Sequence, residues 1–206
     1  MPSFCTAFHN GGKSGSWSGQ RISRVILAVV VRDTDGNILK AGNNYYILPV
    51  MHGVGGGLIT ARGSGELCPT EVAQAISEVQ PGTPLKFIPA NPNKDSIIRE
   101  STDLNIMFVD PLACVPNAVW RVDTDFIRPE QRTLSSRGLL GRPGPQTINN
   151  WFKIQKYQDS YKLVYCPSVC KTCKPACADI GITLSERGRR SLTLNNKPFK
   201  VKFKKA

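Results

Sequence analysis

The chain has 206 residues, of which 40% are hydrophobic and 20% charged, and its formal net charge is +12. This composition is sufficient to bury the core of a single globular domain, and it excludes general disorder. No run approaches the roughly 18 apolar residues of a membrane-spanning helix, so no membrane partner is expected.

The first 30 residues are predicted to form an atypical flexible segment, because residues 1–20 are rich in Gly and Ser and show no hydrophobic period. The apolar run Val25–Val31 follows two arginines but lacks a clean small-residue cleavage site. It is interpreted either as a weak signal-peptide core or as the first strand. The segment 1–30 is therefore treated as removed or mis-assigned, and Cys5 within it as a free thiol.

From Asp33 onward, short strand-like segments alternate with clusters of Gly, Pro and Asn, and no helical period of useful length is present. This pattern predicts an all-β chain. The predicted strands are Tyr45–Val50, Glu71–Ala75, Leu85–Ile88, Leu104–Val109, Val119–Asp123, Trp151–Ile154, Tyr161–Tyr165, Ile180–Leu184, Leu192–Leu194 and Phe199–Phe203.

Three of these segments, which begin at Tyr45, Leu104 and Tyr161, recur at a nearly constant interval of about 58 residues. Three similar units with about four strands each predict a closed three-fold barrel capped by hairpins, which is a β-trefoil. A β-sandwich is the alternative fold.

Four of the seven cysteines, Cys166, Cys170, Cys173 and Cys177, fall within one short run. We interpret them as two nested disulfides, Cys166–Cys177 and Cys170–Cys173, because the sequence is then symmetric about Thr172. A zinc site and an iron–sulfur cluster are the alternatives, but no His lies nearby and Cys166 breaks the ferredoxin spacing. Disulfides persist in an oxidising compartment, so an extracellular or vacuolar location is expected, with no metal and no cofactor.

The C-terminal region is strongly basic. Apolar residues from Phe199 to Phe203 alternate there with Lys200, Lys202 and Lys204, which predicts a strand with a solvated lysine face. A polyanion-binding face is the alternative interpretation. Because the lysines carry no interleaved exposed aromatic residues, nucleic acid is not expected as a partner; its binding would show a steep dependence on salt.

Catalysis is not expected. The two histidines are His9 and His52, and no nucleophile elbow accompanies either of them. No catalytic residue is assigned.

A series of ordered motifs runs from about residue 31 to the C-terminus. The motifs are Asp33–Asn37, Asn44–Pro49, Gly55–Leu58, Cys68–Pro69, Ser101–Ile106, Val119–Val122, Trp151–Ile154, Tyr161–Pro167 and Asp179–Ile182. Together they resemble those of the Kunitz soybean-trypsin-inhibitor family of plants, and the four-cysteine run with Gly141–Pro145 resembles its miraculin-like branch in particular. The resemblance implies a β-trefoil domain over residues 31–206, a further disulfide Cys68–Cys114, and inhibition of trypsin-like serine endopeptidases in plant defence.

Members of this family bind proteases as slow substrates, through one exposed extended loop whose P1 side chain enters the specificity pocket. The resemblance implies that Lys94 is P1, where its ammonium group would meet the acidic base of a trypsin-like pocket. An ordinary solvated loop lysine is the alternative. The reactive-loop residues implied are Asn91, Pro92, Asn93, Lys94, Asp95 and Ser96.

Two departures from the family pattern predict moderate or weak inhibition. The loop is longer than that of the soybean inhibitor, which leaves Asn93 and Asp95 as alternative P1 residues. Ala41 occupies the place of an Asn whose side-chain amide binds the reactive-loop backbone in strong inhibitors.

The alternative functions are a non-inhibitory miraculin-like defence or storage protein and a polyanion-binding module. The taste-modifying role of the branch's namesake is not expected, because no cysteine for a covalent dimer lies between Gln155 and Ser160. A monomer is therefore expected, unless Cys5 links two chains.

Overall fold

The computed structural model describes residues 29–63, 66–92, 95–110, 114–115, 117–124, 132–185 and 188–206. Within these residues, strands dominate and one short 3-10 helix, η1 (Pro145–Asn150), is present, so the all-β prediction is confirmed. No helix in these ranges has the length and apolar composition needed to cross a membrane. The strands are β1 (Tyr45–Pro49), β2 (Leu58–Ala61), β3 (Glu71–Gln74), β4 (Leu85–Pro89), β5 (Leu104–Phe108), β6 (Val119–Thr124), β7 (Arg132–Gly138), β8 (Lys153–Tyr157), β9 (Ser160–Tyr165), β10 (Ala178–Leu184), β11 (Arg190–Asn195) and β12 (Val201–Lys205).

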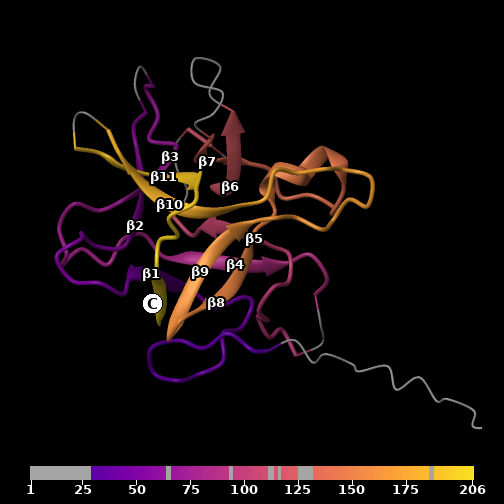
Figure 1. Ribbon diagram of the computed structural model, residues 1–206, viewed down its shortest axis with the longest axis horizontal. Coiled ribbons are helices and arrows are strands. Elements are labelled where there is room, and N and C mark those ends of the chain that lie inside the picture. Colours follow the sequence, from indigo (N-terminus) through magenta and orange to yellow (C-terminus); the bar gives the residue numbers. More distant parts are fainter. Residues whose placement is uncertain are drawn as a thin grey trace, which may run out of the picture.

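Strands β1, β4, β5, β8, β9 and β12 form a closed ring (Figure 1). β1 pairs with β12 along its whole length and meets β4 at Tyr45 and Leu85. On its other side β4 pairs with β5. β12 pairs with β9, which in turn pairs with β8. The ring closes where Leu104 of β5 and Phe152, just before β8, exchange two backbone hydrogen bonds of 2.9 Å. Closure removes the free strand edges that would otherwise pair with other chains.

The remaining strands form three hairpins, β2–β3, β6–β7 and β10–β11, which lie together in the upper part of Figure 1. They also pair with one another, because β3 meets both β7 and β11, and β11 meets β7. A closed ring with a cap of three mutually paired hairpins is consistent with the β-trefoil that the sequence repeats predict.

The core fills the ring with side chains from alternate positions of its strands. β1, β4 and β12 each alternate buried and half-buried residues, as a strand with one face on a core requires. Phe87 and Phe203 meet edge to face with ring centroids 5.5 Å apart, and Tyr161 lies 5.5 Å from Phe203. Trp120 is fully buried and meets Phe152 edge to face. Each buried large apolar side chain contributes about 1.5–3 kcal/mol to stability.

Strands β2 and β7 were not predicted from the sequence. β7 reads Arg-Thr-Leu-Ser-Ser-Arg-Gly, a polar composition that gives no strand signal, yet its Ser135 and Ser136 are buried. The polar groups of Ser136 find a hydrogen-bond partner far away in the sequence, since its N–H and its hydroxyl both donate to the Thr70 carbonyl at 2.7 and 3.1 Å. Burial of these polar groups therefore depends on a contact that no local pattern encodes.

Two predicted strands begin later than expected. β8 begins at Lys153 because Trp151 serves as the C-cap of η1, where its indole N–H donates to the Thr147 hydroxyl at 3.0 Å. β12 begins at Val201 because Phe199 donates its N–H to Ile180 of β10 instead of joining the barrel.

Candidate functional site

The connection between β4 and β5 carries the predicted reactive loop. It leaves β4 at Pro89 and enters β5 at Leu104. Asn91, Pro92, Asp95 and Ser96 belong to the described part of this loop, whereas the predicted P1 residue Lys94 and its neighbour Asn93 lie outside the described residues. The assignment of Lys94 therefore stays a prediction.

Backbone hydrogen bonds anchor the C-terminal base of this loop to the segment before β1. Ala41 donates its N–H to the Ser96 carbonyl at 2.7 Å, and Ile98 donates to Leu39 at 2.9 Å. Ile97 pairs with Lys40 as an antiparallel bridge. Because Ile98 and Leu39 are fully buried, the core fixes the point at which the loop ends.

The N-terminal base is fixed by the strand that follows the loop. Ala90 donates its N–H to the Asp103 carbonyl at 2.8 Å, which continues the β4–β5 ladder by one step beyond Pro89. Both ends of the loop are thus held by backbone contacts to ordered elements, a geometry that lowers the entropy lost when such a loop is bound.

Asp95 and Ser96 form a local turn within the loop. The Oδ1 atom of Asp95 accepts the N–H of Ile97 at 3.1 Å, and its Oδ2 atom pairs with Arg99 at 2.9 Å. Ser96 adopts a φ of 55°, which is a left-handed conformation that costs a residue with a Cβ about 1–2 kcal/mol. Ser96 therefore departs from the extended geometry that the family resemblance implies for a reactive loop.

Ala41 supports the loop through its backbone alone. Its N–H reaches Ser96, while its methyl group packs against the core and offers no donor or acceptor to the loop. Ala41 therefore cannot supply the side-chain hydrogen bonds that the family resemblance implies for an Asn at this place.

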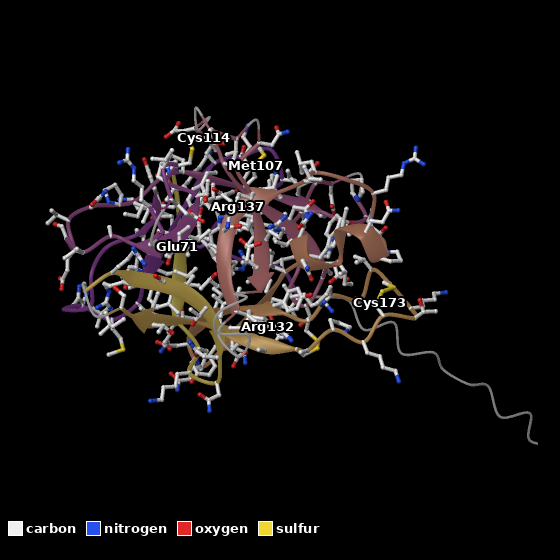
Figure 2. The ribbon with its side chains drawn as sticks, turned by 90° about the horizontal axis from the view of Figure 1, so that it is seen from above. Glu71, Met107, Cys114, Arg132, Arg137 and Cys173 are labelled. Carbon is white, nitrogen blue, oxygen red and sulfur yellow. A yellow bond between two sulfur atoms is a disulfide. The ribbon has the colours of Figure 1, made fainter. Side chains whose placement is uncertain are left out.

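The structure contains three disulfides, Cys68–Cys114, Cys166–Cys177 and Cys170–Cys173. These are the pairs that the sequence symmetry and the family resemblance imply. Figure 2 shows Cys114 at one edge of the molecule and Cys173 on a separate loop. The two bonds of the run 166–177 form what we call the disulfide ring. Cys5 lies outside the described residues.

A largely buried carboxylate ties the disulfide ring to the loop region. Asp103 accepts the N–H of Ser168 at 3.1 and 3.2 Å and also accepts the Ser168 hydroxyl. Lys153 lies 3.7 Å from Asp103 and donates to the Ser168 hydroxyl at 3.2 Å. A cleft of about 350 Å³ separates the ring from the loop, with Asn91 and Ile97 on one side and Val169 on the other. Sequence reasoning missed Asp103, because its partner lies 65 positions away.

Tyr165 fixes the start of the disulfide ring. Its hydroxyl donates to Asn149 Oδ1 at 2.9 Å, and its ring packs against Phe152. Burial raises the pKa of Tyr165 above its ordinary value, with a smaller opposing effect of Arg132, so the residue stays a neutral hydrogen-bond donor.

The described residues show no side-chain cluster suited to a metal ion. No cluster of three or more His, Cys, Asp or Glu side chains is found among them. His52 is exposed in a glycine-rich turn, and His9 lies outside the described ranges. The candidate functional site is the anchored loop with its neighbouring disulfide ring, at the place that the family resemblance implies.

Comparison with known proteins gives a consistent result. A model of the Kunitz legume family, described as "Trypsin and protease inhibitor", matches residues 31–205. Miraculin from Synsepalum dulcificum is 44% identical over 182 residues, covering 85% of this chain and 82% of that protein. Kunitz trypsin inhibitor 5 from Arabidopsis thaliana is 42% identical and covers 85% of each chain. The solved structure of the Kunitz-type cysteine protease inhibitor PCPI-3 from potato matches with a TM-score of 0.76 and 35% identity, covering 87% of this chain and 98% of that chain.

Proposed function

The chain belongs to the Kunitz legume family of trypsin and protease inhibitors, and from this premise we propose that it inhibits trypsin-like serine endopeptidases. It is not an enzyme, since the members of this family are inhibitors. The inhibitory element is the loop Asn91–Ser96, with Lys94 as P1 and Asp95 as P1′. We further infer that the fold is a β-trefoil, supported by the closed ring and its cap of three hairpins.

The anchoring of the loop is the observation that carries this proposal. Ser96 and Ala90, on either side of the inferred scissile bond, make backbone hydrogen bonds to Ala41 and Asp103. A segment held at both ends loses little freedom when it enters a protease cleft, and after cleavage its two new ends stay close together. Such a loop binds as a substrate but is released slowly as a product.

The P1 assignment is tested by Lys94→Ala, with Lys171→Ala as the matched control. Lys171 is an exposed lysine of the disulfide ring, so both variants lose one positive charge from a loop. Truncating a residue that fills a specificity pocket weakens binding by roughly 30-fold or more. We expect this loss in the inhibition constant for trypsin with Lys94→Ala and none with Lys171→Ala; equal inhibition by the two variants would exclude Lys94.

A non-inhibitory defence or storage role is the second candidate. It is favoured by the left-handed φ of Ser96, because P2′ of a substrate-like loop has to be extended, and by the identity to miraculin. A panel of trypsin, chymotrypsin, subtilisin and papain distinguishes the candidates. Inhibition of papain alone would move the target to cysteine proteases, the class that the potato relative is described as inhibiting.

The location and assembly proposed here follow from the disulfides. Three disulfide bonds in 206 residues favour an extracellular or vacuolar protein, in keeping with a role in plant defence. The protein acts as a monomer unless Cys5 joins two chains, which non-reducing and reducing mass measurements on natively isolated protein would distinguish.

A further inference from the structure

The outer face of strands β4, β1 and β12 carries lysines next to apolar side chains. In β12, Lys202 and Lys204 point away from the core, because Val201 and Phe203 between them are fully buried. The register places Leu48 of β1 directly opposite Lys202 and Tyr46 directly opposite Lys204. We call this set, together with Lys86 of β4, the lysine face; the ribbons of β1 and β4 are labelled in Figure 1.

Lys86 extends the lysine face across a third strand. It is half-buried between the fully buried Leu85 and Phe87, so its side chain points outward like those of β12. Because Tyr45 pairs with Leu85, Lys86 is the diagonal cross-strand neighbour of Tyr46. Diagonal neighbours in an antiparallel pair are about 7–8 Å apart, which places Tyr46 between lysines on both sides.

The lysine face is not neutralised. Lysines on the adjoining strand and turn have carboxylate partners, since Lys162 pairs with Asp179 at 2.7 Å and Lys200 pairs with Asp159. Lys86, Lys202 and Lys204 have no carboxylate oxygen within 4.0 Å among the described residues. Residues two positions apart on a strand are separated by about 6.8 Å, so the charges of β12 repel one another.

A bound polyanion would relieve this repulsion, and Tyr46 and Leu48 would supply apolar contact between the charges. The sequence did not reveal this arrangement, because Tyr46 and Lys204 are far apart in the chain and meet only through the β1–β12 ladder. An apolar and aromatic strip between the two ammonium groups of β12 and that of Lys86 fits a polymer whose units have apolar C–H faces and carry regularly spaced negative charges.

We propose that the lysine face binds a linear polysaccharide whose sugar units carry carboxylates. The disulfides indicate an oxidising compartment outside the cytosol, where anionic polysaccharide is an available polymer. Lysine is a compact point charge with three rotatable donors, so lysines spaced along a strand can each pair with a separate carboxylate of successive sugar units. Half-buried Tyr46 offers no open stacking platform of the kind that single-stranded nucleic acid requires.

The test measures binding of the full chain to polygalacturonate by titration calorimetry at low and at physiological ionic strength. The variant Lys86→Gln/Lys202→Gln/Lys204→Gln removes three charges from the lysine face. The control Arg142→Gln/Lys171→Gln/Lys174→Gln removes three exposed charges from the region around the disulfide ring. A third variant with arginine at the three lysine-face positions keeps the charge.

We expect the lysine-face variant to bind about 100-fold more weakly than the parent, since each basic residue near an anionic surface contributes roughly fivefold. The control and the arginine variant should stay within about threefold of the parent. Equal loss in the variant and the control, or no binding by the parent, would overturn the proposal. Tighter parental binding to a single-stranded oligonucleotide or to anionic lipid vesicles at the same salt would also overturn it.

This inference is independent of the inhibitory loop. Trypsin inhibition measured on the same variants should be unchanged, because none of the three lysines belongs to the loop Asn91–Ser96. If the lysine-face variant loses polygalacturonate binding and still inhibits trypsin, the proposed role of the lysine face is supported. If the parent chain binds polygalacturonate but inhibits no protease, the role of the lysine face is still supported and the proposed inhibitory function is refuted.

Discussion

Replacing Asp103 by Asn tests whether one largely buried carboxylate holds the disulfide ring against the loop region. The Asp103 side chain is 10% exposed and faces Ser168 and the 14% exposed Lys153. Asn has nearly the same shape but no charge, so the substitution leaves no cavity and changes mainly the electrostatic interactions.

The size of the effect follows from the contacts. Two unit charges 3.7 Å apart attract by about 4 kcal/mol at an effective dielectric constant of 20, and desolvation of both groups removes much of this gain. A hydrogen bond to a charged group contributes about 1.5–3 kcal/mol. We therefore expect Asp103→Asn to lower the free energy of unfolding by about 2–3 kcal/mol. Asp103→Ala should lower it by about 3–5 kcal/mol, because Lys153 is left largely buried and unpaired.

Urea unfolding with the disulfides intact measures this change. Asp35→Asn is the control, since Asp35 is exposed in a turn and has no ion pair among the described residues. Its effect should stay within about 0.5 kcal/mol. In a double-mutant cycle, Lys153→Met should cost less in the Asp103→Asn background than in the parent. A loss for Asp103→Asn no larger than that of the control would refute the assigned role of this carboxylate.

Two further predictions concern stability. A Cβ at Gly181 would clash with both Asn195 Oδ1 and the Lys197 carbonyl oxygen, so Gly181→Ala should lower the unfolding free energy by about 1–3 kcal/mol. Gly144→Ala is the control and should leave the unfolding free energy unchanged, because a Cβ there has nothing within 4 Å. Equal thermal midpoints for the two variants would contradict this prediction. Because burial raises the pKa of Tyr165, the unfolded chain loses this proton first, and the stabilisation is present below about pH 10 and is lost as pH rises further. Unfolding free energy should thus fall more steeply above about pH 10 in the parent than in Tyr165→Phe, and identical slopes would argue against a buried phenol.

The fold was predictable wherever hydrophobic alternation and turn residues agreed. The ring strands β1, β4, β5 and β9 combine apolar alternation with a turn at each end, and all four were found close to their predicted bounds. β7 was not predicted, because the burial of its serines depends on a hydrogen bond to Thr70, more than sixty positions away. Local patterns report which face of a strand is apolar, and they carry no information on which distant carbonyl will accept a buried hydroxyl.

The candidate site was predictable only as a sequence interval. The resemblance implies a reactive loop at Asn91–Ser96, but the turn of Asp95, the φ of Ser96 and the link from Asp103 to Ser168 arise from contacts that the local sequence pattern does not encode. The lysine face was predictable only in part. Hydrophobic alternation predicted outward lysines in β12, but it did not predict Tyr46 beside them, because Tyr46 belongs to β1 at the other end of the domain sequence.

The described support of the loop near Ser96 comes from backbone contacts and from the loop itself. Ala41 contributes its backbone N–H, the carboxylate of Asp95 accepts the N–H of Ile97 and pairs with Arg99, and Ser96 between them has a left-handed conformation. If Lys94–Asp95 is the scissile bond, a protease has to extend Ser96 and break the Asp95 turn before the loop fits its cleft. A hydrogen bond contributes about 0.5–1.5 kcal/mol and an exposed ion pair less than about 1 kcal/mol, while extending Ser96 recovers about 1–2 kcal/mol of backbone strain, so binding should be weakened by at most roughly tenfold relative to a loop already extended. The same contacts that order the free loop therefore limit its affinity, which is the physical basis for expecting moderate or weak inhibition.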